Sequence, residues 1–157
     1  IEIKQVIEDS NQSVHVDYPF YLLLSERESK DTNDSSLISY FTYDHLTYLF
    51  MGDASKQIEK QLMAAYDLKA DVIKVGHHGS NTSSDSDFLD SLDCKIALIS
   101  CGYKNKYGHP SVETLKTLEN LHINTLCTSD CGSIAMYSLF HFSFVVTNDG
   151  MFGIIWT

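Results

Sequence analysis

Apolar runs and amphipathic stretches alternate through the middle of the chain. Residues 35–41 and 45–51 are two β-rich runs separated by three residues, which is hairpin spacing. Ser55 can then cap a helix with four apolar positions at helical spacing: Ile58, Leu62, Met63 and Tyr66. The pattern predicts a strand hairpin followed by an amphipathic helix.

Two further strand and helix pairs follow. The short β-branched run at 71–75 predicts a buried strand, and Ser84 or Asp85 can cap a helix that carries Phe88, Leu89 and Leu92. Residues 96–100 predict the next strand, and Ser111 opens a helix with one apolar side: Val112, Leu115, Leu118 and Leu121. Alternation of strand and helix predicts strands that run alongside one another in one sheet.

The two ends of the chain are predicted to be β-rich. Residues 1–24 predict two or three strands, and the polar stretch 25–34 predicts a loop. Four more strands are expected after the third helix, at 123–127, 133–137, 142–146 and 151–156. The turn 147–150, which contains Asn, Asp and Gly, predicts a hairpin between the last two.

Unusual polar residues follow three of the predicted strands. They are Asp53, the adjacent pair His77 and His78, and then Asn105 and His109. If the strands are parallel, these loops converge at one edge of the sheet. Carboxylate and imidazole are common ligands of Zn²⁺ and Mn²⁺, so a metal site is plausible there.

Composition and charge exclude few classes of function. The formal net charge of −10 argues against a general nucleic-acid-binding surface, although bound cations would remove that objection. No apolar run is long enough to cross a membrane, so no membrane contact is expected from this segment itself. The four cysteines lack zinc-finger spacing and are expected to be buried or partly buried free thiols.

The first residues suggest a piece of something larger. The chain starts at Ile1 without a methionine, and residues 1–7 already have the pattern of a strand. We expect a single domain over residues 1–157, cut from a longer protein that could include a membrane segment.

Three stretches together carry a resemblance to a known family. Residues 49–54 (Leu-Phe-Met-Gly-Asp-Ala), 74–80 (Lys-Val-Gly-His-His-Gly-Ser) with Ser83 and Ser84 behind them, and 105–110 (Asn-Lys-Tyr-Gly-His-Pro) match in order and spacing. The chain resembles the C-terminal metallo-β-lactamase-like domain of the ComEC family of DNA-internalisation competence proteins. Any one of the three stretches alone would be weak evidence for this family.

The resemblance implies a fold and a chemistry. The fold would be α/β (α+β), an αββα sandwich of which this chain is mainly the C-terminal half, with a mixed sheet and about three helices. The complete domain would use two divalent cations, Zn²⁺ or Mn²⁺, to hydrolyse DNA by a metal-bound hydroxide.

The resemblance also implies roles for single residues. Asp53 and His109 match metal ligands. His77, His78 and Ser80 match a motif beside the metals and are candidate catalytic residues. Candidates for substrate binding are Lys74, Ser83, Asn105 and Lys106.

One part of the family pattern is missing. The family also uses an earlier His-x-(His or Asp)-x-Asp-His segment, but residues 15–20 have Pro19 and Phe20 where Asp and His belong. Asp53, His109 and one of the paired histidines cannot fill two metal spheres. We therefore expect this chain to bind metal weakly, or not at all, and to be inactive without the missing N-terminal half.

The resemblance also sets expectations for the parent protein. It would be bacterial and lie in the cell membrane, with this domain soluble on the outer side and DNA as the substrate. An exposed sheet face would invite pairing of two copies into a homodimer. Two alternatives remain open: a stand-alone soluble hydrolase of the same superfamily, or a metal-free scaffold that binds partners.

Simpler interpretations exist for single residues. Asp53 could be a carboxylate that stabilises a helix start. His109 could be an ordinary loop residue before Pro110. His15, His45, His122 and His141 fit strand or helix patterns and are not expected in the site.

Overall fold

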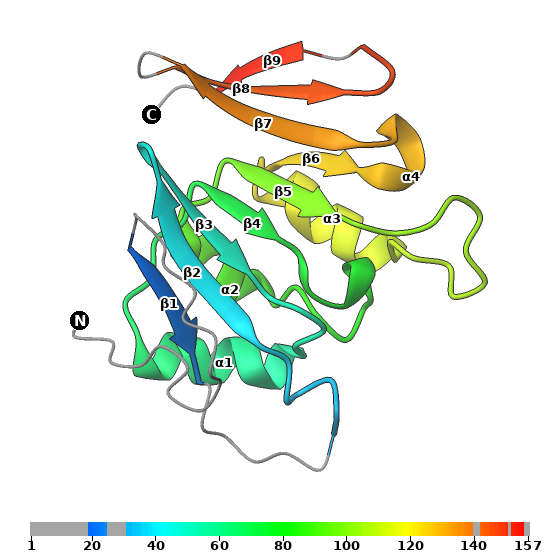
Figure 1. The fold of residues 1–157 in the computed structure, drawn as a ribbon. Helices are drawn as coiled ribbons and strands as arrows, with labels where there is room; N and C mark the ends of the chain where they lie inside the picture. The colour runs from blue at the N-terminus through cyan, green and yellow to red at the C-terminus, as the bar shows by residue number, and fades with distance from the viewer. Residues whose placement is uncertain (1–18, 25–30, 140–141, 151, 156–157) are drawn as a thin grey trace, which may run out of the picture.

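The chain folds into two sheets and a layer of helices in a computed structural model that describes residues 19–24, 31–139, 142–150 and 152–155. The first sheet has six strands in the order β1 to β6 (Figure 1). They are β1 Phe20–Leu23, β2 Ile38–Tyr43, β3 Leu46–Phe50, β4 Val72–Lys74, β5 Ile96–Ile99 and β6 Asn124–Cys127. The second sheet contains β7 Ile134–Leu139, β8 Phe142–Thr147 and β9 Phe152–Ile155.

Helices connect the strands of the first sheet. They are α1 Lys56–Ala65, α2 Ser86–Leu92 and α3 Val112–Asn120, with a short helix α4 Thr128–Cys131 after β6 and a 3₁₀ turn η1 Gly76–Gly79 at the paired histidines. Strands β1 to β3 pair antiparallel, whereas β3, β4, β5 and β6 are parallel. The predicted mixed α/β fold is confirmed.

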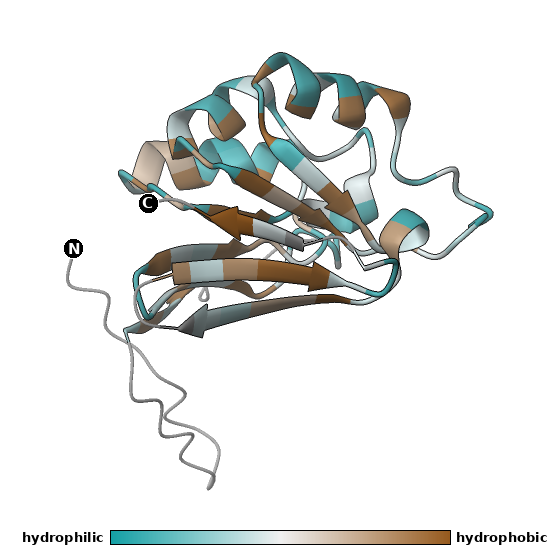
Figure 2. Ribbon diagram, turned by 90° about the horizontal axis from the view of Figure 1, so that it is seen from above, coloured by the Kyte–Doolittle hydropathy of each residue, from teal (hydrophilic) through white to brown (hydrophobic). Residues whose placement is uncertain are grey.

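Side chains on alternate positions of the parallel strands build two cores. Leu49, Ile73 and Ala97 lie in register and face the helices, where they join the larger core. Their neighbours Tyr48, Val72 and Ile96 face the opposite way and pack against the second sheet through Ile155. Figure 2 shows the larger helices on one side of the strands. The layers are therefore helices, six-stranded sheet and three-stranded sheet.

Most predicted elements appear close to their expected positions. Ser55 precedes α1 and Asp85 caps α2, where its side chain accepts hydrogen bonds from the N–H groups of Asp87 and Phe88. Ser111 caps α3 by accepting from Thr114 N–H. Strands predicted at 1–18, and the segment around His15, lie outside the described residues.

Two helix faces differ from the prediction. Met63 was expected inside, but it is exposed because α1 turns Ile58, Glu59 and Leu62 towards the core. In α3 the buried positions are Thr114 and Leu118, whereas the expected core residues Val112 and Leu115 are exposed. Leu118 is buried and Leu121 packs against the core as the pattern predicts, but the buried side of α3 also contains Thr114, a polar residue that the apolar pattern does not include.

Candidate functional site

The carboxyl ends of three parallel strands bring the predicted site residues to one edge of the sheet. Phe50, Lys74 and Leu98 lie side by side at the ends of β3, β4 and β5. Asp53 follows the first of these strands, the paired histidines follow the second, and the loop to His109 follows the third. The expected convergence of these loops is confirmed.

The histidine loop has an unusual backbone. His77 and His78 both have positive φ, at 46° and 56°, a region that residues with a side chain seldom occupy. His77 N–H donates to Gly52 O at 3.0 Å, and Ser80 N–H donates to His77 O at 2.9 Å. Such strain persists only where surrounding contacts hold it, and it is typical of functional loops.

The hydrogen bonds of His78 define its tautomer. Its Nδ1 lies 2.6 Å from the carbonyl oxygen of Ser100, which can only accept, so Nδ1 carries the proton. In the neutral ring, Nε2 then has a free lone pair, and this atom lies 3.8 Å from Asp53 Oδ1. His78 is thus oriented to offer Nε2 to a metal ion or to a proton beside Asp53.

His77 is oriented by a chain of hydroxyl groups. Thr82 Oγ1 donates to Ser80 Oγ at 3.1 Å, so it accepts at 3.2 Å from His77 Nδ1. Nε2 of His77 is thereby also left unprotonated in the neutral ring. The ring centres of His77 and His109 are 5.9 Å apart, which brings the second and third loops together.

The serines of this loop are buried and hold its shape. Ser83 Oγ contacts Gly76 O at 2.9 Å and Ser80 O at 3.0 Å. Ser80 O also accepts from Thr114 Oγ1 of α3 at 3.0 Å. Both serines are almost inaccessible to solvent. The structure therefore favours a positioning role for Ser80 and Ser83 in place of the expected catalytic role and substrate contact.

Asn105 organises the loop that carries His109. Its Nδ2 donates to the carbonyl oxygens of Gly102 and His109, and its Oδ1 accepts from the N–H groups of Tyr107 and His109. These four bonds use both amide protons and both lone pairs of the oxygen. The side chain expected to bind substrate is occupied within its own loop.

His109 lies at the wall of a small cavity. The cavity, about 190 Å³ in volume, is lined by His78, Cys101, Gly102, Asn105, Tyr107 and His109. Desolvation, followed by the charges of His77 and His78, lowers the pKa of His109, which favours the neutral ring. Its Nδ1 is buried without a hydrogen-bond partner. A buried unpaired nitrogen of this kind is suited to a ligand.

Two lysines flank the site. Desolvation lowers the pKa of Lys74, and the neighbouring charge of Asp53 partly opposes that shift. Lys106 extends from the loop between β5 and α3, which projects from the sheet in Figure 1, and its Nζ lies 4.9 Å from the ring centre of Tyr107. The Tyr107 ring in turn stacks on His109 with an interplanar angle of 16°.

The described residues do not form a complete metal centre. Among residues 19–24, 31–139, 142–150 and 152–155, no group of three or more His, Cys, Asp or Glu side chains is placed to hold an ion. Asp53, His78 and the unpaired nitrogen of His109 are suitable donors, but they fit only part of a two-ion site.

Several residues around the site carried little sequence signal. Tyr107 stacks on His109, Thr82 contacts His77, and Ser100 acts through its backbone carbonyl, which any residue type could supply. Thr114 is buried in α3, although its polar side chain gives no sequence signal of burial. The position of Tyr107 two residues before His109 was the available hint.

Comparison with known proteins places the chain among bacterial competence proteins. No family model matches the chain. It is 36% identical over 120 residues to ComE operon protein 3 of Bacillus subtilis, and 33% identical over 126 residues to competence protein ComA of Neisseria gonorrhoeae. A shorter match, 37% over 70 residues, is to recombination protein 2 of Haemophilus influenzae.

The matches cover most of this chain but little of each relative. The first two span 75% and 79% of the chain, yet only 16% and 18% of the relatives' own lengths. None of the helices in the described ranges is both long and apolar enough to cross a membrane.

Proposed function

Because the chain belongs to the ComEC family of competence proteins, we propose that it is part of a metal-dependent phosphodiesterase domain acting on DNA. The domain would have the metallo-β-lactamase-like αββα architecture, and this chain would supply its second half. The observation that carries the proposal is the meeting of Asp53, His78 and His109 from three successive loops at one sheet edge.

Asp53 and His109 are the proposed metal ligands of this chain. Two divalent cations, Zn²⁺ or Mn²⁺, would supply a hydroxide at neutral pH and neutralise phosphate charge. The remaining ligands would come from the N-terminal half of the domain, outside the described residues. This division explains why the described residues alone fit only part of a centre.

The paired histidines are proposed to handle protons and phosphate oxygens. His78 holds its Nδ1 proton on the Ser100 carbonyl and so presents Nε2 beside Asp53. His77 is held in the same way by Thr82. With Nε2 free, each ring can accept a hydrogen bond or a proton from a reacting group and return the proton to a leaving oxygen. Lys74 and Lys106 are the proposed phosphate contacts.

The placement of the parent protein is also part of the proposal. We place it in a bacterial cell membrane, with this domain on the outer side and DNA as substrate. Degradation of DNA at the outer side would fit a role in DNA uptake, the process to which the names of the competence relatives refer.

The decisive experiment compares two lengths of chain. We would titrate Mn²⁺ and Zn²⁺ calorimetrically into the 157-residue chain and into a form extended upstream to include the missing His/Asp segment. We expect tight binding of about two ions by the longer form only. A DNA-cleavage assay should then show activity in the longer form that Asp53→Ala abolishes.

Three outcomes would contradict the proposal. Mn²⁺-dependent nuclease activity of the short chain, lost in Asp53→Ala, would show that the site is complete without the upstream half. Absence of metal binding by both forms would make Asp53, His78 and His109 structural, and the scaffold alternative would then lead. A soluble hydrolase would instead be indicated by cleavage of small phosphodiesters and not of DNA.

A further inference from the structure

Two cysteine thiols meet at the ends of neighbouring parallel strands. Cys127 is the last residue of β6, and Cys101 comes two residues after the end of β5. Their Sγ atoms lie 3.3 Å apart, although both are free thiols in this structure. Only a small movement would bring the sulfur atoms to bonding distance.

The backbone around the two cysteines is held in place. The β5–β6 ladder pairs Ile99 with Cys127. Cys101 N–H donates to Thr128 Oγ1 at 3.0 Å, and the same hydroxyl donates to Cys101 O at 2.9 Å. The sulfur contact is therefore built into this edge of the sheet.

The two thiols differ in their access to solvent. Cys127 is 6% exposed, whereas Cys101 is half-buried and lines the cavity that also contains His78 and His109. A reagent at the cavity can thus reach Cys101 first, and Cys127 Sγ, 3.3 Å from Cys101 Sγ, is close enough to attack the product.

We infer that Cys101 and Cys127 form a disulfide when the protein meets an oxidant of the disulfide class, such as oxidised glutathione. The bond would join the start of the loop containing Asn105 and His109 to the end of β6. It is an oxidative modification site beside the candidate site, and it does not depend on the proposed function.

The reaction balances as thiol–disulfide exchange. The Cys101 thiolate attacks oxidised glutathione, which breaks the glutathione S–S bond and releases one reduced glutathione. Cys127 then loses its proton and attacks the Cys101 sulfur, which forms the protein S–S bond and releases the second glutathione. The two cysteines lose two electrons, and oxidised glutathione gains them.

The other two cysteines are poorer partners. Cys131 Sγ donates to the Cys127 carbonyl oxygen at 3.1 Å. Cys94 lies before β5, at the opposite end of that strand from Cys101, and burial raises its pKa to about 12. Pairing between Cys101 and Cys127 is thus the exchange that the fold favours.

The test uses the reduced chain equilibrated with mixtures of reduced and oxidised glutathione. Thiol titration should fall from four thiols to two, and mass spectrometry of a digest should show Cys101 linked to Cys127. The oxidised protein should melt roughly 5 to 10 °C higher than the reduced protein, because the bond restrains the unfolded chain.

Matched variants identify the pair. Cys101→Ser should abolish both the thiol loss and the rise in melting temperature, whereas Cys94→Ser should retain both. Because Cys127 is buried, Cys127→Ser could impair folding, so the half-buried Cys101 is the primary variant. Retention of four thiols, persistent glutathione on Cys101, or a linkage through Cys94 or Cys131 would overturn the inference.

Discussion

The orientation of the site imidazoles depends on contacts made by single residues. A backbone carbonyl orients His78, a hydroxyl group orients His77, and desolvation lowers the pKa of His109. None of these contacts follows from the residue types alone. Each is made by a group from another part of the loop cluster.

Lys106 gives a prediction about DNA contact at the residue scale. Lys106→Ala in the upstream-extended domain should weaken DNA binding and reduce the slope of log affinity against log salt by about 1, because one phosphate contact is lost. Fluorescence anisotropy across a salt series would measure this. The exposed Lys116 on α3 is the control, and an equal effect of Lys116→Ala would remove the case for a specific contact.

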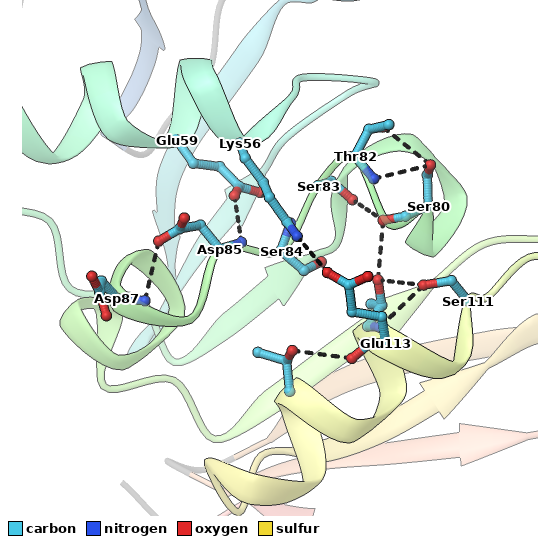
Figure 3. Close-up of polar contacts among 12 residues, drawn as sticks. Lys56, Glu59, Ser80, Thr82, Ser83, Ser84, Asp85, Asp87, Ser111 and Glu113 are labelled. Carbon is cyan, nitrogen blue, oxygen red and sulfur yellow. Dashed lines mark hydrogen bonds and ion pairs between the residues drawn. The ribbon is translucent and has the colours of Figure 1, made fainter.

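Glu59 gives a prediction about pH at the same scale. Its carboxylate is 1% exposed and accepts from the N–H groups of Ser84 and Asp85 (Figure 3). Its pKa is raised to about 7, mainly because burial removes the carboxylate from water. The folded state therefore binds the proton more tightly than the unfolded state, so this stabilisation is complete below about pH 4.5 and is lost as the pH rises through 7.

The expected loss over that range is about 3 kcal/mol. Denaturant unfolding between pH 4 and 8 should show it in the wild-type chain and not in Glu59→Gln. Glu119→Gln, at an exposed position of α3, should leave the wild-type pH dependence unchanged. A Glu59→Gln variant with the full wild-type pH dependence would show that another group is responsible.

At the scale of elements, the histidine loop depends on its packing against the start of α3. Gly79 has a φ of +79°, and a Cβ there would lie 2.8 Å from Pro110 Cβ. Gly79 O also accepts from Ser111 N–H at 2.8 Å, which joins the loop to the helix cap. The loop and helix therefore approach too closely for a side chain at this position.

Gly79→Ala should lower the free energy of unfolding by about 2 to 4 kcal/mol, through backbone strain and the clash together. Gly108→Ala separates the two causes, since Gly108 has a φ of +70° but open space around its Cβ position. We expect Gly108→Ala to lower the free energy of unfolding by about 1 kcal/mol. Equal losses in the two variants would mean that the contact with Pro110 is unimportant.

At the scale of the whole molecule, the second sheet is held by apolar contacts with the first. Ile155 of β9 is 6% exposed and packs with Leu46, Tyr48, Val72 and Ile96. Its neighbour Ile154 is 49% exposed. Both residues are isoleucines of β9, so a comparison of the two isolates the effect of burial.

Ile155→Ala should destabilise the fold by about 2 to 4 kcal/mol, because it removes buried methyl groups between the sheets. Ile154→Ala should cost under about 1 kcal/mol. Urea unfolding of the two variants would compare them. Similar losses would indicate that the second sheet contributes little through this contact.

Local pattern was sufficient for much of the architecture. The period of apolar residues and the caps at Asp85 and Ser111 predicted the hairpin, the helices and the parallel strands, because these features depend on near neighbours in the chain. Parallel order then implied that Asp53, His78 and His109 converge. The three stretches that carry these residues also resemble the ComEC family, which the relatives confirm.

Tertiary structure decided which polar groups remain available. In the folded chain, Asn105 forms its hydrogen bonds within its own loop, and Ser80, Ser83 and Thr114 are buried. The fold also places the Sγ atoms of Cys101 and Cys127 in contact. The sequence by itself determined which residues reach this edge of the sheet. Only the fold decided their partners, because hydrogen bonding and burial depend on segments that are distant in the chain.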